Sequence, residues 1–133
     1  MPQSPAPAMR RALIVDDDAF QCEMLREQLR QADWHDVRVC AGGQEALAAL
    51  QRDSLRHWDL VLVDLHMPGM DGFQFMQGLE SAGFRGAVVI VSGQSSEVVH
   101  SAALVAQLQR LRLLGTLSKP VQKAALKALL VQA

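Results

Sequence analysis

The feature that most constrains the fold is a regular alternation of short apolar runs with longer amphipathic stretches. The apolar runs lie at residues 12–15, 37–40, 60–63, 87–91 and, more weakly, 116–117. Three of these runs are continuously apolar, which is typical of parallel strands covered by helices on both faces. The run at 37–40 is more mixed and predicts an edge strand. The pattern therefore predicts a sheet of five parallel strands.

The stretches between the runs have helical periodicity and suitable end residues. Asp18 is a candidate N-cap for the first helix. The fourth helix is expected to begin at Ser95 or Ser96 and to continue through Leu114, and Pro120 suits the first turn of the fifth. The buried stripe expected on the fifth helix consists of Ala125, Leu126, Leu129 and Leu130.

This order of elements predicts an α/β fold of the flavodoxin-like (βα)5 type. Its simplest arrangement is a doubly wound parallel sheet with strand order 2-1-3-4-5 and a functional crevice at the carboxyl ends of the strands. Residues 1–11 hold three prolines among small and polar residues and are expected to form a disordered leader. Residues 12–133 are then expected to form one domain.

Composition excludes several classes of protein. The 133 residues include 13 Lys and Arg against 14 Asp and Glu, so the net charge of −1 argues against direct nucleic-acid binding. The longest apolar stretch is far shorter than the roughly twenty residues that a membrane span requires. Cys22 and Cys40 are too few for a disulfide framework and favour a reducing compartment, the cytoplasm.

The charge is unevenly distributed along the chain. Residues 1–97 carry all 14 acids and 8 basic residues, a sum of −6, whereas residues 98–133 carry 5 basic residues and no acid, a sum of +5. An acidic partner surface for the basic part is one interpretation, and ordinary solvated side chains are the other.

Polar side chains follow the predicted strands at their carboxyl ends. Asp16 and Asp17 follow the first strand and Asp64 follows the third, which is its neighbour in the expected order. Three carboxylates this close repel one another unless a cation neutralises them. Mg²⁺ prefers a few carboxylates together with water and phosphate oxygens, so the sequence predicts a magnesium site here.

Two further strand ends complete a phosphoryl-transfer set. Ser92 ends the fourth strand and Lys119 follows the fifth. The Asp64 carboxylate can attack a phosphorus atom held in line, while the metal, the ammonium and the hydroxyl share the charge on the phosphoryl oxygens.

These residues together resemble the receiver domain of two-component response regulators. The resemblance runs from residue 12 to 133 and is carried by residues 13–18, 63–72, 91–93 and 118–120. It implies that Asp64 is the phosphoacceptor and that Asp17 and Asp64 bind Mg²⁺ directly. By the same resemblance, Asp16 would bind the metal through water and His66 would supply a backbone carbonyl.

The resemblance also implies a function and partners. The domain would accept a phosphoryl group from a sensor histidine kinase or a phosphotransfer protein, and would be a signalling switch rather than an enzyme with turnover. Its output surface would be the fourth helix, fifth strand and fifth helix, acting on a C-terminal or separate output domain or forming a homodimer. The widely spread apolar residues of the fourth helix fit either such an exposed surface or simple core packing.

Two departures from the family pattern affect these expectations. The family usually has Tyr or Phe three residues before the lysine, whereas this chain has Thr116 there and no Tyr at all, so the usual aromatic switch is in question. The stretch from Ser92 to Lys119 is a few residues longer than in most relatives. It is similar to receivers that precede EAL-type cyclic-di-GMP phosphodiesterase domains.

Three other functions compete with the phosphoacceptor hypothesis. The altered fourth helix and Thr116 also fit a pseudo-receiver, a constitutive interaction module whose pocket does not signal. A flavin carrier of the same fold needs a phosphate-binding loop of Ser, Thr and Gly after the first strand, where this chain has three aspartates. A haloacid-dehalogenase-like phosphatase would use Asp16 and Asp18, but the complete Asp64 loop and the lack of a cap domain disfavour it.

Overall fold

The structure, a computed structural model, describes residues 10–52, 57–67, 69–93 and 95–132. Of the leader predicted over residues 1–11, residues 1–9 lie outside the described part of the chain. The first strand begins at Arg11, one residue before the predicted start of the domain at Ala12.

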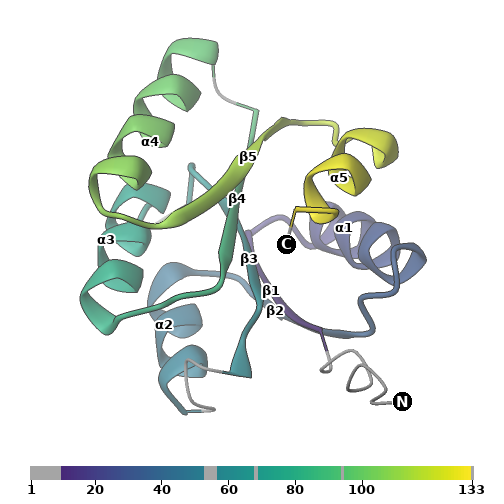
Figure 1. Ribbon diagram of the computed structural model, residues 1–133, viewed down its shortest axis with the longest axis horizontal. Helices are drawn as coiled ribbons and strands as arrows, with labels where there is room; N and C mark the ends of the chain where they lie inside the picture. Colours follow the sequence, from purple (N-terminus) through teal and green to yellow (C-terminus); the bar gives the residue numbers. More distant parts are fainter. Residues whose placement is uncertain (1–9, 53–56, 68, 94, 133) are drawn as a thin grey trace, which may run out of the picture.

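Within the described residues, five strands alternate with five helices (Figure 1). The strands are β1 (Arg11–Val15), β2 (Asp36–Cys40), β3 (Leu60–Asp64), β4 (Ala87–Ser92) and β5 (Arg112–Ser118). The helices are α1 (Ala19–Gln31), α2 (Gly43–Arg52), α3 (Gly72–Ala82), α4 (Ser96–Leu108) and α5 (Lys123–Leu130). All strand pairs are parallel and the order is β2-β1-β3-β4-β5, which confirms the predicted fold and the edge position of β2.

The helices cover both faces of the sheet. Helices α1 and α5 lie on one side, and α2, α3 and α4 lie on the other (Figure 1). Alternate residues of β1 serve the two cores: Leu13 packs on the α2–α4 side and Ile14 on the α1–α5 side, both with no exposed surface. Burying each such side chain contributes roughly 1.5–3 kcal/mol. This two-sided burial explains why the central strands are continuously apolar.

Local signals place the ends of the helices near the candidate site. Asp18 caps α1 as predicted, and its side chain accepts the backbone N–H groups of Phe20 and Gln21. Asp71 caps α3 through a capping box with Gln74. These caps fix where α1 and α3 begin, and so they fix the lengths of the loops that follow β1 and β3.

The predicted end of the fourth helix is wrong. Helix α4 ends at Leu108 rather than Leu114, and residues 112–118 form a seven-residue β5. Arg110 adopts a left-handed backbone (φ 59°), which ends the helical path. An apolar run of this length suits a helix or a buried strand equally well, and here pairing with β4 selects the strand.

The predicted start of the fifth helix is also wrong. Helix α5 begins at Lys123, and Pro120 precedes it in a cis peptide bond with Lys119. Ala125, predicted to be buried, is exposed, whereas Leu126 and Leu130 form the buried stripe. Leu129, which is partly buried, packs against the same core, so three of the four residues predicted for the stripe are confirmed.

The apolar residues of α4 include both buried core residues and an exposed one, so each of the two expectations for this helix holds in part. Ala102 and Ala106 are fully buried, whereas Leu104 is 47% exposed. None of the described helices is long and apolar enough to cross a bilayer.

Candidate functional site

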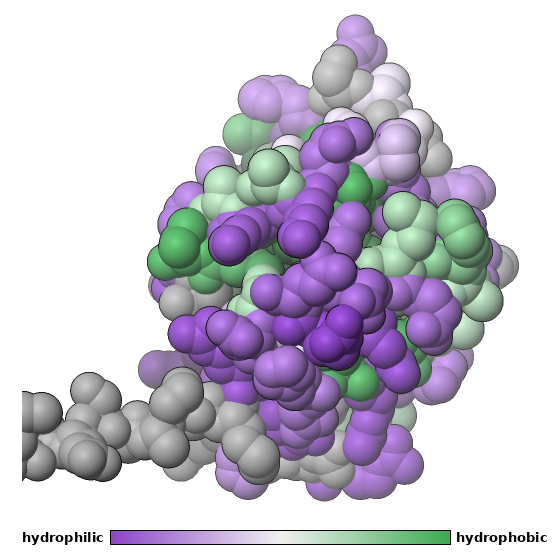
Figure 2. All heavy atoms as spheres, turned by 90° about the vertical axis from the view of Figure 1, so that its right-hand side faces the viewer, coloured by the Kyte–Doolittle hydropathy of each residue, from purple (hydrophilic) through white to green (hydrophobic). Residues whose placement is uncertain are grey.

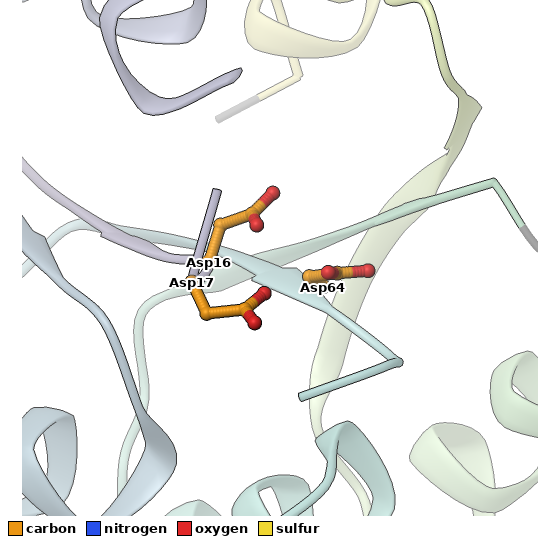
Figure 3. Close-up of side chains that lie close together, drawn as sticks. All are labelled: Asp16, Asp17 and Asp64. Carbon is orange, nitrogen blue, oxygen red and sulfur yellow. The ribbon is translucent and has the colours of Figure 1, made fainter. Parts of the chain in front are cut away.

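Three aspartates gather at the carboxyl end of the sheet. Asp16 and Asp17 follow β1, and Asp64 is the last residue of β3, the strand beside it. One carboxylate oxygen from each lies within 4.8 Å of the others (Figure 3). Asp16 and Asp64 are buried, whereas Asp17 is exposed. The convergence predicted from strand order is therefore present.

Lys119 joins this cluster from the end of β5. Its Nζ lies 2.9 Å from Asp16 Oδ2 and 3.3 Å from Asp64 Oδ2. Its backbone N–H also donates to the carbonyl of Ser92, at 3.0 Å. One cation thus bridges two buried carboxylates, while its main chain is held by the end of β4.

The local charges shift the protonation equilibria of the site. Burial, followed by the neighbouring charge of Asp16, raises the pKa of Asp64, although Lys119 partly opposes the effect. Burial lowers the pKa of Lys119, but hydrogen bonds and ion pairs with Asp16 and Asp64 outweigh it, so the net pKa is raised. Lys119 therefore stays protonated at neutral pH. The raised pKa of Asp64 means that its ionised form costs free energy in the folded protein.

The remaining predicted residues differ in how close they come to the carboxylates. Ser92 is 1% exposed and ends β4, next to the strand that carries Asp64. The backbone N–H of His66 donates to Asp64 Oδ1 at 3.3 Å, while its side chain is exposed. Thr116 is exposed and pairs with Ile90 in the β4–β5 ladder. Since Ile90 lies two residues before Ser92, Thr116 is set back from the carboxyl end of the sheet, where the carboxylates gather.

The loop after Asp64 is closed tightly by a glycine. The N–H of Gly72 donates to the carbonyl of Leu65 at 3.1 Å. A Cβ atom on Gly72 would lie 2.7 Å from Leu65 Cα and 2.8 Å from the carbonyl oxygen of Asp64. Since both neighbours are main chain, only glycine fits, and this contact fixes the path of the loop behind Asp64.

Sequence reasoning missed two side chains next to the cluster. The thiol of Cys22 donates to the carbonyl of Asp16 at 3.3 Å, and burial raises its pKa to about 11. Phe20, in the first turn of α1, is 73% exposed. Its place could have been found from periodicity, because Leu25 and Leu29 mark the buried side of this helix and Phe20 falls on the other side.

The donor set fits a hard divalent cation. Asp16, Asp17 and Asp64 offer only oxygen ligands, and the Lys119 ammonium offsets the repulsion between Asp16 and Asp64. Mg²⁺ is bound through one or two carboxylates, with water and phosphate oxygens completing an octahedron. The three aspartates are therefore the residues that would hold it.

A separate groove of about 760 Å³ lies between α2 and α3, with Gly43, Met70 and Gln77 among its lining residues. None of the three aspartates lines it. The groove is therefore distinct from the candidate site, which we identify by its clustered carboxylates and Lys119 rather than by the volume of a cavity.

Comparison with known proteins agrees with this geometry. The family model for the response regulator receiver domain matches residues 12–131. A two-component response regulator, ARR2 of Arabidopsis thaliana, is 38% identical over 57% of this chain and 11% of that protein. The protein-glutamate methylesterase/protein-glutamine glutaminase 5 of Myxococcus xanthus is 35% identical over 69% of this chain and 26% of that protein. The chain thus spans about a quarter or less of these relatives.

Solved structures show the same architecture. A response regulator from Colwellia psychrerythraea superposes with a TM-score of 0.79 at 28% identity, over 93% of this chain and 95% of that chain. The signal receiver domain of an HD domain-containing protein from Pseudomonas fluorescens has a TM-score of 0.82 at 19% identity, over 99% of this chain and 91% of that chain. The second likeness concerns the fold alone.

Proposed function

The chain belongs to the response regulator receiver family, a family of signalling domains, and we propose that it accepts a phosphoryl group on Asp64 from a histidine kinase or phosphotransfer protein. The observation that carries this proposal is the convergence of three carboxylates within 4.8 Å, bridged by the Lys119 ammonium. Apart from the nucleophilic carboxylate, such a site has to supply only positioning and charge stabilisation.

The proposed transfer is a displacement at phosphorus. An oxygen of Asp64 forms the new O–P bond as the N–P bond of phosphohistidine breaks, and the electron pair of that bond stays on the imidazole nitrogen. The Asp64 carboxylate must be ionised to attack, and its hydrogen bond from the His66 N–H at 3.3 Å favours that form.

The other site residues would bind the cation and the phosphoryl oxygens. Asp17 and Asp64 would hold Mg²⁺ directly, Asp16 through water, and His66 through its backbone carbonyl. Bound Mg²⁺ would supply the positive charge that offsets the carboxylates and the incoming phosphoryl oxygens. Lys119, already 3.3 Å from Asp64, would turn from Asp16 toward those oxygens.

Phosphorylation would then shift the surface formed by α4, β5 and α5. Ser92 and Lys119 would move toward the phosphoryl group, and their direct backbone hydrogen bond would carry the movement into the β4–β5 pair. Thr116, exposed on β5, would serve as the switch position in place of an aromatic residue. The shifted surface would act on a C-terminal or separate output domain, or on a second copy of the chain.

This proposal places the domain in the cytoplasm, where a histidine kinase delivers phosphate and where buried free thiols such as Cys22 and Cys40 remain reduced. The alternative, a pseudo-receiver that interacts constitutively, is not favoured, because the acidic cluster and its lysine are intact. The alternative predicts equal affinity for a partner with and without phosphate.

Mass spectrometry tests the proposal. The chain is incubated with Mg²⁺ and phosphoramidate, a small donor with an N–P bond, and the expected product carries one phosphoryl group that hydroxylamine removes. Asp64→Asn is the matched variant, since it keeps the side-chain shape and removes the nucleophile. An unmodified wild-type chain, or an equal modification of Asp64→Asn, would contradict the proposal.

A further inference from the structure

Three of the described helices end in the same way. After α1, α3 and α4, one residue adopts a left-handed backbone, the next is apolar and buried, and the one after it is basic and exposed. The three exits are Asp33-Trp34-His35, Gly83-Phe84-Arg85 and Arg110-Leu111-Arg112. In each exit the N–H of the apolar residue donates to the carbonyl five residues earlier, at 2.9 or 3.0 Å. The shared exit therefore brings an exposed basic side chain to the amino end of the strand that follows.

Arg110 is an unusual residue for the left-handed position. Glycine adopts a positive φ without a steric penalty, and aspartate does so more readily than most residues. These two types occupy the position after α3 and α1, whereas after α4 a long side chain is held at φ 59°. Strained backbone of this kind occurs most often at functional positions. The conformation of Arg110 therefore points to a role for its guanidinium group.

Arg85, Arg110 and Arg112 form a basic surface that we call the arginine corner. Helices α3 and α4 lie on the same face of the sheet and lead into the neighbouring strands β4 and β5 (Figure 1). Arg112 pairs with Ala87, which is two residues after Arg85, and Arg110 is two residues before Arg112. Since neighbouring strands lie roughly 4.8 Å apart, three exposed guanidinium groups surround the beginnings of two adjacent strands.

No carboxylate of the described residues neutralises this corner. Arg85 and Arg110 make no ion pair or side-chain hydrogen bond in that part of the chain, and Arg112 donates to the backbone carbonyl of Gln132 at 2.7 Å. Asp59, which precedes β3, accepts a backbone N–H of β1 at 2.9 Å. The corner thus offers guanidinium donors to a partner, and one guanidinium is already held in place.

The face formed by α1 and α5 has a different character. Figure 2 shows that this face is mainly hydrophilic, with a few separate hydrophobic patches. The exposed charges along α1 alternate in sign, from Glu23 and Arg26 to Glu27 and Arg30, and the last two form an ion pair. Mixed charges of this kind cancel at a distance, whereas a corner of one sign attracts a partner of the opposite sign.

We propose that the arginine corner binds an acidic segment of a partner protein, whose Asp or Glu carboxylates pair with Arg85, Arg110 and Arg112. A guanidinium group can bind a carboxylate through two parallel N–H groups, which the ammonium group of lysine cannot do. Nucleic acid suits the corner less well, because a protein bound to DNA commonly makes roughly 6–10 phosphate contacts. The corner has only these three cations, and the chain as a whole has a net charge of −1.

This inference is independent of the proposed function of Asp64. The arginine corner lies at the amino ends of β4 and β5, whereas Ser92 and Ser118 pair at the carboxyl ends of the same two strands, next to Lys119. A partner bound at the corner would leave the acidic cluster open to a phosphodonor. Phosphorylation of Asp64 could therefore fail while binding at the corner succeeds, and the reverse also holds.

Fluorescence anisotropy with a labelled oligoglutamate peptide at low ionic strength tests the proposal on the full chain. Arg110→Gly should weaken binding about threefold, as expected for an exposed ion pair. Because glycine relieves the left-handed backbone, Tm should stay the same or rise by up to about 4 °C. The triple variant Arg85→Gln, Arg110→Gly and Arg112→Gln should weaken binding about tenfold or more. Added salt should weaken binding to the wild-type chain.

Arg26→Gln is the matched control, because Arg26 is exposed on α1, away from the corner, and should leave the affinity within about 1.5-fold of wild type. A cation at the end of α4 could act only on the helix dipole. In that case Arg110→Gly would lower Tm and leave the affinity unchanged, which would overturn the proposal. So would an Arg26→Gln loss as large as that of Arg110→Gly, no binding of the peptide, or tighter binding of an oligonucleotide of the same net charge.

Discussion

Replacing Lys119 by methionine removes the positive charge that bridges Asp16 and Asp64 and keeps a side chain of similar length. A hydrogen bond to a charged group contributes about 1.5–3 kcal/mol when it is buried. Lys119 makes two such contacts, at 2.9 and 3.3 Å, but its side chain is 22% exposed and solvent weakens both. We therefore expect Lys119→Met to lower the free energy of unfolding by about 2 kcal/mol, or Tm by roughly 6–10 °C for a domain of this size.

The loss should depend on pH and on magnesium. The pKa of Asp64 is raised in the folded protein, mainly by burial, so the stability that its protonated form contributes is present in acid and is lost as pH rises through the folded pKa. Without Lys119 that pKa rises further, and the variant should lose more stability at pH 7 than at pH 5. Millimolar Mg²⁺ would replace the missing charge, so its stabilising effect should be larger in the variant than in the wild-type chain.

Thermal unfolding followed by circular dichroism, at both pH values and with and without Mg²⁺, measures these effects. Lys123→Met is the matched control, because Lys123 is exposed at the start of α5 and should change stability by less than about 0.5 kcal/mol. The reasoning fails if Lys119→Met unfolds at the wild-type temperature, or if Mg²⁺ stabilises both proteins equally.

Three further changes probe the framework around the site. Gly72→Ala should lower the free energy of unfolding in urea by about 1–3 kcal/mol, because the added Cβ would meet main-chain atoms at 2.7 and 2.8 Å. Gly42→Ala is the control and should be nearly neutral, because a Cβ there would have nothing within 4 Å. Equal losses in the two variants would refute this reasoning. Asp71→Ala should cost about 1 kcal/mol through loss of the α3 capping box, and an unchanged urea midpoint would argue against that role. Cys22 and Cys40 are buried, and burial raises the pKa of each thiol to about 11. Iodoacetamide should therefore label them at pH 8 only in denaturant, and rapid labelling of the native protein would contradict their burial.

The acidic cluster could be predicted because its residues stand at places that local sequence determines. Asp16, Asp17 and Asp64 directly follow continuously apolar runs, and the order of a doubly wound sheet makes those two runs neighbours. No side-chain detail was needed for that step. The direct ion pairs of Lys119 with Asp16 and Asp64 depend on side-chain positions at the end of another strand, which sequence spacing does not determine.

The region between α4 and α5 could not be predicted for a physical reason. Residues 111–118 are apolar enough for a helix or a buried strand, and the choice depends on pairing with β4, more than twenty residues earlier in the chain. The β4–β5 ladder also contains an irregularity at Val88 and Val89 that shifts the register by one residue. Local propensity carries no information about either feature.

The interaction that stabilises the resting site is also the one that a phosphoryl group would disturb. Lys119 offsets the repulsion between Asp16 and Asp64 and has no second cation to share that role within the described part of the cluster. A phosphoryl group on Asp64 adds negative charge there, and the ammonium must then divide its contacts differently between the two aspartates. Because the Lys119 N–H donates to the Ser92 carbonyl, our proposal has a movement of Lys119 act on the paired ends of β4 and β5. In this proposal, stability and switching would both depend on Lys119, and neither role would require an aromatic side chain at position 116.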